Sequence, residues 1–310
     1  MADYTLKQLN DAARSDPKGF IKLCEDYYRN QVDSTARELA ARRRTSPIVL
    51  VNGPSSAGKT TTTARLRQAL EKRHGIKTKT ISMDDYYRTS GEYETPFDEE
   101  NGVDDLESPL CMNLEMLTDH LRKLAAGEEI SVPVFDFHLR KSIPDSKKLR
   151  LEPGEMVIIE GIHALSDIVY DGLGESATGV FLSFDSALTL ENGIVAEPFM
   201  LRFMRRTVRD SLFRNTPVSA TIAQWKSVRR GERLYIMPNR GRAALTLDTY
   251  MPYETFIIAE MLRHPFSCMK EELTAAGLEP LTHLDGCFEP LDYVHHIPED
   301  SLIHEFIGYV

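Results

Sequence analysis

Residues 53–60 read GPSSAGKT, and this stretch decides how the rest of the chain is interpreted. The apolar run Ile48-Val49-Leu50-Val51 precedes it, and a helix-favouring stretch from Thr61 to Glu71 follows it. The residues fit the pattern G-x-x-x-x-G-K-[ST] in its strand–loop–helix setting, where backbone N–H groups surround a polyphosphate. An ordinary glycine-rich turn is the alternative, but such a turn does not require these flanks. The stretch therefore predicts a P-loop that binds a nucleoside triphosphate.

The positions of this loop have expected roles toward ATP and Mg²⁺. Lys59 is expected to neutralise the β- and γ-phosphates, and the Thr60 hydroxyl is expected to bind Mg²⁺. The glycines allow the backbone to bend around the phosphates, so that successive N–H groups point at the anion. The predicted ATP-binding residues of the loop are Gly53, Ser55, Ser56, Ala57, Gly58, Lys59, Thr60 and Thr61.

The composition is that of a globular protein with a sizeable core. Of the 310 residues, 42% are hydrophobic and 27% are charged, and the formal net charge is −10. This acidic balance argues against nucleic-acid or anionic-membrane partners. The N-terminus lacks a secretory signal pattern, and no apolar run is long enough to span a membrane. Four scattered cysteines without metal-ligand spacing favour reduced thiols in a cytoplasmic protein. A homo-oligomer is left open.

The chain is expected to form an α/β domain between two appendages. Residues 1–45 are predicted to be a helical extension in which Asp16-Pro17 starts a helix. The apolar face of that helix is expected to contain Phe20, Leu23, Cys24, Tyr27 and Tyr28. Residues 46–265 are predicted to be the P-loop domain, with a lid near 198–240. Residues 266–310 are expected to form a helix and a tail that pack on the core.

Apolar segments predict the strands of this domain. Residues 77–82, 156–160 and 180–184 read as strands in addition to 48–52, and the last two show no polar alternation. Strands buried on both faces read this way in parallel sheets. Helices are expected at 114–124, 253–264 and 267–276, an extended stretch at 132–137 and a loop at 88–110. We therefore expect a doubly wound, mainly parallel sheet of the P-loop NTPase kind with a helical lid.

Acidic residues follow two of the predicted strands. Ligands of open parallel sheets bind at the carboxyl ends of the strands, where Asp84 and Glu160 are expected. Asp84 could accept a proton from an attacking hydroxyl, help to hold Mg²⁺, or do both. Asp85 is its immediate neighbour, so the choice depends on which side chain faces the site. Helix caps or surface acids are the alternatives for Asp84 and Glu160.

Four arginines share a helical spacing. Arg202, Arg205, Arg206 and Arg209 recur at i, i+3, i+4 and i+7, which places four guanidinium groups on one helical face. Within this segment Asp210 is the acid close enough to relieve their repulsion. Such a stripe suits a lid that closes on phosphates, because guanidinium binds phosphate in a bidentate manner. The alternative is a solvated face that pairs with acids elsewhere.

Aromatic residues and one histidine have structural and functional interpretations. Phe135, Phe137, Tyr86 and Tyr87 could stack on a planar ring, but aromatic residues belong to the core by default. His163 is expected to be structural.

Taken together, the sequence resembles the uridine kinase / phosphoribulokinase family of P-loop kinases, and among them bacterial uridine kinase-like proteins with an N-terminal extension. The similarity covers residues 45–265. It rests on five stretches: GPSSAGKT (53–60), SMDDYYR (82–88), PVFDF (133–137), VIIEGIHAL (157–165) and RFMRRTVRD (202–210).

The resemblance implies a role for each matching residue. Asp84 corresponds to the catalytic base and Mg²⁺ neighbour, and Glu160 to an acid that helps to hold the metal. Tyr87, Phe135 and Phe137 correspond to residues beside the nucleoside. The arginines correspond to the lid, with Arg205 expected to act in catalysis, Arg206 and Arg209 on ATP, and Arg202 on the substrate.

Two residues depart from the family pattern. Asn113 stands where an Asp usually binds the ribose hydroxyls, and Phe135 stands where nucleoside kinases often have Tyr.

The motifs and the resemblance together give the hypothesis of an ATP- and Mg²⁺-dependent small-molecule kinase that phosphorylates the 5′-hydroxyl of a pyrimidine nucleoside. A kinase for another alcohol, such as a sugar phosphate or a pantothenate-like acceptor, is one alternative. A non-catalytic nucleotide-binding regulator is the other.

Overall fold

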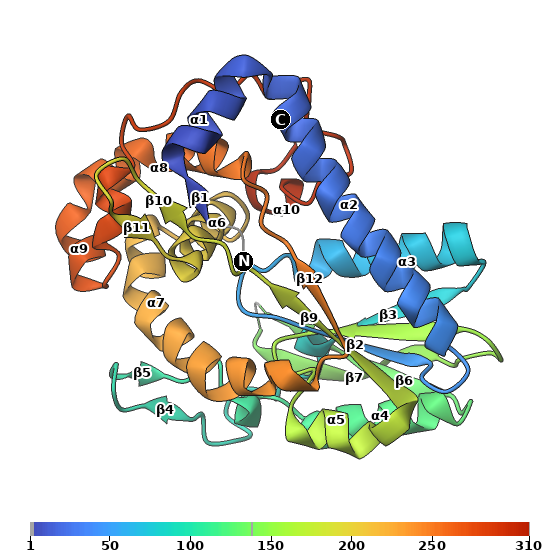
Figure 1. Cartoon of the computed structure of the whole chain (residues 1–310). Coiled ribbons are helices and arrows are strands. Elements are labelled where there is room, and N and C mark those ends of the chain that lie inside the picture. Colours follow the sequence, from blue (N-terminus) through green and yellow to red (C-terminus); the bar gives the residue numbers. More distant parts are fainter. Residues whose placement is uncertain (1–2, 138, 310) are drawn as a thin grey trace.

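A five-stranded parallel sheet forms the centre of the computed structural model, which describes residues 3–137 and 139–309 (Figure 1). The strand order is β12-β9-β2-β8-β3, and every pair of neighbours is parallel. This confirms the predicted α/β fold, although the edge strand β12 was not predicted. The strands are β2 (Ile48–Asn52), β3 (Thr78–Ser82), β8 (Met156–Glu160), β9 (Ala177–Ser183) and β12 (Leu245–Asp248).

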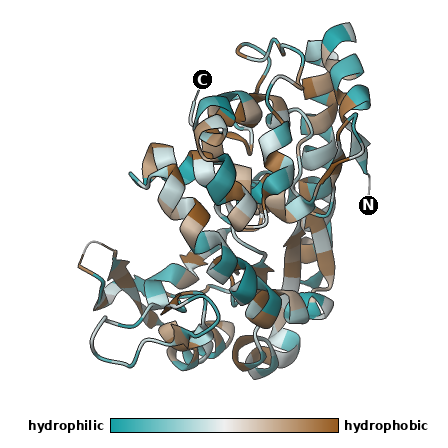
Figure 2. Ribbon diagram, turned by 90° about the vertical axis from the view of Figure 1, so that its left-hand side faces the viewer, coloured by the Kyte–Doolittle hydropathy of each residue, from teal (hydrophilic) through white to brown (hydrophobic). Residues whose placement is uncertain are grey.

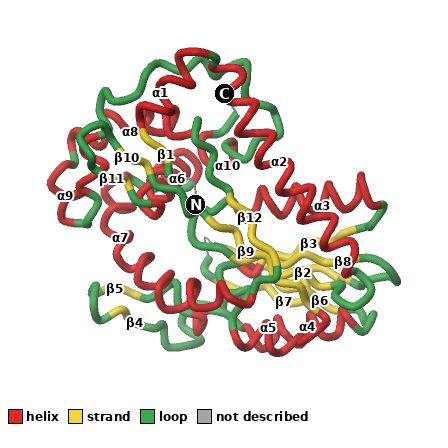
Figure 3. The backbone as a smooth tube through the Cα atoms, viewed as in Figure 1, coloured by secondary structure: helices red, strands yellow, loops and turns green. Residues whose placement is uncertain are grey.

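Helices cover both faces of the sheet because alternate residues of each strand point to opposite sides. In β2, Ile48 and Leu50 pack in the cluster that includes α4 (Leu114–Ala125) and α5 (Asp167–Leu173). Val49 and Val51 pack in the other cluster, with α2 (Pro17–Arg42) and α3 (Lys59–His74). Figure 3 shows these two helical layers with the strands between them, and Figure 2 shows the hydrophobic strands inside the molecule.

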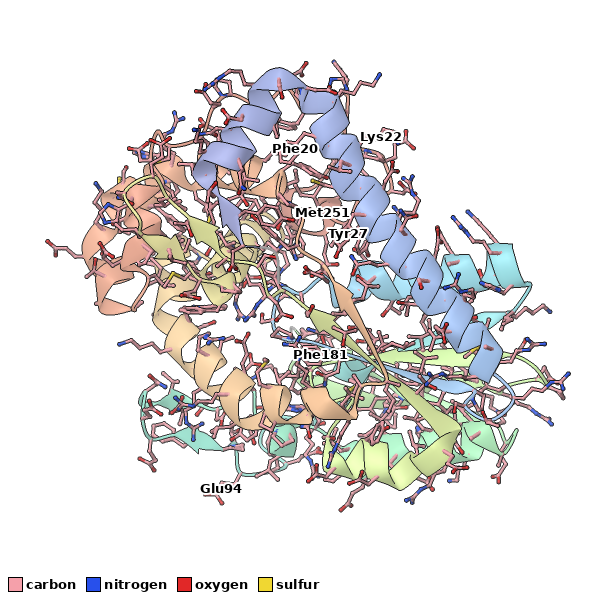
Figure 4. The ribbon with its side chains drawn as sticks, in the orientation of Figure 1. Phe20, Lys22, Tyr27, Glu94, Phe181 and Met251 are labelled. Carbon is pink, nitrogen blue, oxygen red and sulfur yellow. The ribbon has the colours of Figure 1, made fainter. Side chains whose placement is uncertain are left out.

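The N-terminal extension packs on this core. It consists of β1 (Tyr4–Thr5), α1 (Leu6–Ser15) and α2. Asp16 accepts a hydrogen bond from the Gly19 N–H and caps α2, with Pro17 at the first helical position, as predicted. Phe20 contacts Phe256 edge-on at 6.1 Å between ring centroids, whereas Lys22 points outward (Figure 4).

The predicted apolar face of α2 is partly wrong. Leu23 and Tyr27 are 70% and 57% exposed. Ile21, Cys24 and Tyr28 are buried instead. The helix contacts the core along one narrow line, so residues one position away from this line reach solvent.

A further group of helices and several short strands complete the chain. Helices α6 (Pro198–Phe213), α7 (Val218–Gly231), α8 (Glu254–Cys268), α9 (Lys270–Ala275) and α10 (His304–Ile307) form the part opposite the sheet. The hairpins and small strands are β4 (Phe97–Asp98), β5 (Val103–Asp104), β6 (Ile130–Asp136), β7 (Lys141–Leu149), β10 (Leu188–Thr189) and β11 (Val195–Ala196). All four cysteines are free thiols. Among the described residues, no helix combines the length and the apolar character needed to cross a bilayer.

Candidate active site

Three strand ends meet at one edge of the sheet. β8 lies between β2 and β3, and Glu160 is in register with Val51 on one side and Ser82 on the other. The Ser82 hydroxyl donates a hydrogen bond to Glu160 Oε1 at 3.0 Å and accepts one from the Asp84 N–H at 3.3 Å. The sheet therefore places the P-loop, Asp84 and Glu160 side by side.

The P-loop backbone is bent, and the Lys59 ammonium points back to carbonyl oxygens of the loop. Gly58 has a φ of 74°, and Ser56 has a φ of 57°, which is unfavourable for a side chain that is not glycine. The Lys59 ammonium donates to the carbonyl oxygens of Gly53 and Pro54 at 3.0 Å each. Gly53 has no room for a side chain, since a Cβ there would lie 2.9 Å from the Leu182 carbonyl oxygen.

Four carboxylates act electrostatically on this ammonium group. Burial lowers the pKa of Lys59, and the charges of Glu160, Asp84, Glu305 and Glu107 act in the opposite direction. No carboxylate of the described chain lies within ion-pair distance of it, so the direct partners of the Lys59 ammonium are the carbonyl oxygens of Gly53 and Pro54. Once the Lys59 ammonium leaves the loop carbonyl oxygens, it could bind an entering polyphosphate.

Asp84 and Asp85 point to different parts of the molecule. The Asp84 side chain is exposed to solvent, although protein atoms also lie around its carboxylate. Burial raises its pKa, and the positive charges of Lys59, Arg214 and Arg209 oppose this rise. Asp85 instead accepts a hydrogen bond from the Phe135 N–H of β6 at 3.4 Å. Asp84 is therefore the acid that faces the P-loop.

The oxygen atoms at this edge fit Mg²⁺ bound together with phosphate. Mg²⁺ prefers hard oxygen ligands and is usually held by one or two carboxylates plus substrate phosphates. Thr60 is exposed and its hydroxyl has no hydrogen-bond partner within the described chain, and the Asp84 and Glu160 carboxylates lie at the same edge. In that described part, no cluster of three or more acidic, histidine or cysteine side chains could hold a metal without a substrate.

The predicted stripe of free arginines is wrong for Arg202 and Arg205. Arg202 is 4% exposed, and it pairs with both carboxylate oxygens of Glu232 and donates to the Ser55 carbonyl at 2.9 Å. Burial alone would raise the pKa of Glu232, but Arg202 and Arg229 hold it below its usual range. Arg202 therefore supports the P-loop from beneath.

Arg205 is completely buried in the same layer. Its guanidinium pairs with Glu254 at 2.8 Å and donates to Thr249 and to the Ser56 carbonyl. It also lies over the ring of Phe306 at 4.6 Å. A guanidinium group has five N–H donors, and these acceptors occupy them all. Arg205 has no donor left for a phosphate, which corrects the catalytic role expected for it.

The next turns of α6 keep cations near the site. Arg206 donates to the Ser55 hydroxyl at 2.8 Å, and Arg206, Arg209 and Arg214 share one acid, Asp210. One carboxylate cannot neutralise three guanidinium groups, so positive charge remains beside the P-loop and Asp84. Sequence reasoning identified Arg206 and Arg209, and missed Arg214 because it lies outside the regular spacing.

Glu107 is a second residue that sequence reasoning missed. Burial raises its pKa to about 6, with Arg206 and Lys59 opposing the rise and Glu232 adding to it. The start of its side chain is fixed against Gly231, where a Cβ would lie 2.3 Å from Glu107 Cβ. Glu107 lies in an acidic stretch without helical or strand periodicity. Its position six residues before Asn113 is the one sequence signal that could have pointed to it.

His163 is structural, as expected. It is 1% exposed, and its Nε2 atom contacts the Glu107 carbonyl oxygen at 2.9 Å, so Nε2 carries the proton. Burial lowers its pKa to about 4, which keeps the ring neutral near pH 7.

The aromatic residues form one cluster beside the site. Ring centroids lie 5.5 Å apart for Tyr87 and Phe135 and 5.0 Å apart for Phe135 and Phe137. Phe137 is 61% exposed, whereas Tyr86 is buried and bonded to His120. Tyr87 and Asn113 also line a cavity of about 530 Å³. Asn113 Oδ1 caps α4 by accepting from the Met116 N–H, which leaves its amide NH₂ group for a ligand.

Comparisons with known proteins agree with this arrangement. The model of the Phosphoribulokinase / Uridine kinase family matches residues 48–252. The uridine kinase of Bacillus pumilus is 29% identical over 188 residues, which are 60% of this chain and 79% of that protein. The uridine kinase of Oceanobacillus iheyensis is 27% identical over 203 residues, which are 65% and 86%.

Solved structures with some likeness include two kinases. One is described as a possible uridine kinase from Bacillus stearothermophilus, with 18% identity, a TM-score of 0.46 and coverage of 71% of this chain and 98% of that one. The other is D-glycerate 3-kinase from Cryptococcus neoformans, with 15% identity, a TM-score of 0.33 and coverage of 82% and 87%.

Proposed function

The chain belongs to the phosphoribulokinase / uridine kinase family of P-loop kinases, and we propose that it transfers the γ-phosphoryl group of ATP to the 5′-hydroxyl of a pyrimidine nucleoside. The observation that carries this proposal is the position of Asp84. Its carboxylate interacts electrostatically with Lys59 and Glu160, while its neighbour Asp85 is bonded to β6.

Asp84 acts as the general base in this proposal. It accepts the proton of the attacking hydroxyl, and its raised pKa makes it a better base than an exposed carboxylate. Lys59 leaves the Gly53 and Pro54 carbonyl oxygens and binds the β- and γ-phosphates. Arg206 and Arg209 offset the charge that develops on the transferred group.

Mg²⁺ would be held by the Thr60 hydroxyl and the carboxylates of Asp84 and Glu160. When bound, it neutralises phosphate charge and orients the γ-phosphoryl group. The hydrogen bond from Ser82 fixes the orientation of the Glu160 carboxylate for this purpose.

The acceptor assignment rests on the aromatic cluster and on the relatives. Tyr87, Phe135 and Phe137 offer ring faces and edges to a planar base, and the Asn113 amide lies on the cavity next to Tyr87. Glu107 adds a carboxylate that could accept hydrogen bonds from a ribose diol. The sequence relatives named above are uridine kinases.

A kinase for another alcohol is the second candidate. Phe135 has no hydroxyl with which to read a base, and the Asn113 carbonyl oxygen is used as a helix cap. Both features weaken base and ribose recognition without affecting the phosphate site. A sugar phosphate or a pantothenate-like acceptor would need fewer contacts from these two residues.

An acceptor panel tests the proposal. The full-length protein is incubated with ATP and Mg²⁺ and, separately, uridine, cytidine, phosphosugars or pantothenate, and products are detected by mass spectrometry. Uridine or cytidine monophosphate is the expected product. Phosphorylation of another alcohol alone would support the second candidate. ATP binding without any phosphorylated product would contradict a kinase and favour a nucleotide-binding regulator.

A further inference from the structure

The C-terminal segment 300–308 packs directly on the P-loop, although almost 250 residues separate them in the sequence. Leu302, Ile303 and Phe306 are fully buried. A Cβ at Gly58 would lie 2.6 Å from Leu302 Cδ1, so the leucine rests on the glycine of the loop. Figure 1 shows α10 in the space between α6 and α2. The segment therefore packs as part of the protein surface that supports the P-loop.

Several contacts hold this segment in place. Asp300 pairs with Arg65 of α3. The Ser301 hydroxyl bonds to the buried Glu25 of α2 and lies 3.1 Å from the Tyr253 hydroxyl. The ring of Phe306 lies against the Arg205 guanidinium. These contacts fix the backbone of the segment, and with it the position of Glu305.

Glu305 is the residue of this segment that bonds to the first turn of α3, directly after the P-loop. Its Oε2 atom accepts a hydrogen bond from the Thr61 N–H at 3.0 Å. Thr61 lies in the first turn of α3, where N–H groups have no acceptor within the helix. These N–H groups are the donors that a P-loop offers to the α- and β-phosphates. In the described chain no cation pairs with Glu305, and its charge acts on Lys59 and Glu160.

We propose that Glu305 is an internal competitor for the triphosphate and sets the nucleotide affinity of the P-loop. This inference rests on the proposed function, because it assumes that ATP enters this loop. An α- or β-phosphate oxygen and the Glu305 carboxylate are both anionic acceptors and cannot share the Thr61 N–H. Glu305 turns away when the nucleotide binds, and the lost hydrogen bond and the repulsion between like charges weaken the binding.

The test is a binding titration of ADP and of inorganic tripolyphosphate to the full chain and to variants. Glu305→Ala removes the competing carboxylate, and Glu305→Gln removes its charge while keeping the side-chain length. Glu299→Gln removes one charge from an exposed position just before the same segment and is the matched control. Thermal unfolding of each variant checks that it is folded.

Glu305→Ala is expected to bind both ADP and tripolyphosphate about tenfold more tightly than the unaltered protein, a charge-assisted hydrogen bond being worth about this factor. Glu305→Gln should lie between them, and Glu299→Gln should be unchanged. Unchanged or weaker binding by folded Glu305→Ala would overturn the inference, since Glu305 would then be neutral or a nucleotide ligand. If the unaltered protein binds neither probe, the proposed function fails as well.

Discussion

Replacing Arg205 by methionine removes the guanidinium group on which the layer beneath the P-loop depends. Arg205 is fully buried, its partner Glu254 is 2% exposed, and the pair is joined at 2.8 Å. Removing one partner of a buried ion pair leaves an uncompensated charge, which costs about 3–5 kcal/mol. We therefore expect Arg205→Met to lower the free energy of unfolding by about 4 kcal/mol.

The double variant Arg205→Met, Glu254→Met separates the cost of the unpaired Glu254 carboxylate from the cost of the lost Arg205 hydrogen bonds. With both charges gone, the buried unpaired carboxylate no longer contributes, and apolar replacement of a whole buried pair is often close to neutral. The hydrogen bonds from Arg205 to Thr249 and Ser56 remain lost, at about 1 kcal/mol each. We expect the double variant to be at least about 1 kcal/mol more stable than the single one.

Urea unfolding followed by tryptophan fluorescence measures these differences. Trp225 is the only tryptophan, is 1% exposed and lies 5.2 Å from Phe203 of α6 between ring centroids. Arg263→Met is the matched control, because Arg263 is about half exposed and pairs with the exposed Glu260, and it should change the stability by less than about 1 kcal/mol. A loss below about 1 kcal/mol for Arg205→Met, or no recovery in the double variant, would refute the buried-pair account.

Three further predictions concern the carboxyl edge of the sheet. Burial raises the pKa of Glu107 to about 6, so its ionisation makes folding less favourable as the pH rises from about 4.5 to 6. In urea unfolding at pH 7.5, Glu107→Gln should therefore be roughly 2 kcal/mol more stable than the unaltered protein. Near pH 4.5 the two proteins should be equally stable. The lowered pKa of His163, about 4, has the opposite sign: stability falls as the pH drops from 6.5 toward 4, and His163→Gln should lose that part of the slope in the same titration, so an unchanged slope would contradict its neutral burial. Glu160→Gln should raise the Mg²⁺ concentration for half-maximal turnover by about tenfold or more, and an unchanged requirement would remove Glu160 from the metal site.

Much of the fold could be predicted because local signals agreed with each other. The P-loop pattern, the unalternated strand at 156–160 and the Asp16-Pro17 helix start each depend on neighbouring residues only. The parallel order of the strands follows from the helices between them. Strand β12 was missed since it is short and only one of its four residues, Leu247, is fully buried.

The partners of the arginines could not be predicted from the sequence. Glu232 lies 30 residues after Arg202, and Glu254 lies 49 residues after Arg205. No local pattern reveals that folding brings these acids beneath the P-loop. The helical spacing correctly placed the guanidinium groups on one side of α6 but could not distinguish a phosphate from a buried carboxylate as their acceptor.

The same limit applies to residues that reach the site from distant segments. Glu305 follows no motif, and its contact with Thr61 exists only because the C-terminal segment is anchored on α2 and α3. Conversely, the choice between Asp84 and Asp85 needed only one structural fact, the bond from Asp85 to β6.

The most direct measurement compares acceptor-dependent turnover in Asp84→Asn and Asp85→Asn. Both substitutions remove one charge from adjacent positions, and asparagine at 85 can still accept the bond from the Phe135 N–H. With the alcohol that the panel identifies, kcat should fall at least about a hundredfold for Asp84→Asn. The Kd for ADP in that variant should stay within about threefold of its original value, and Asp85→Asn should keep most of the kcat. Near-normal turnover by Asp84→Asn, or an equal loss in both variants, would contradict the assignment of Asp84 as the base at the phosphate site.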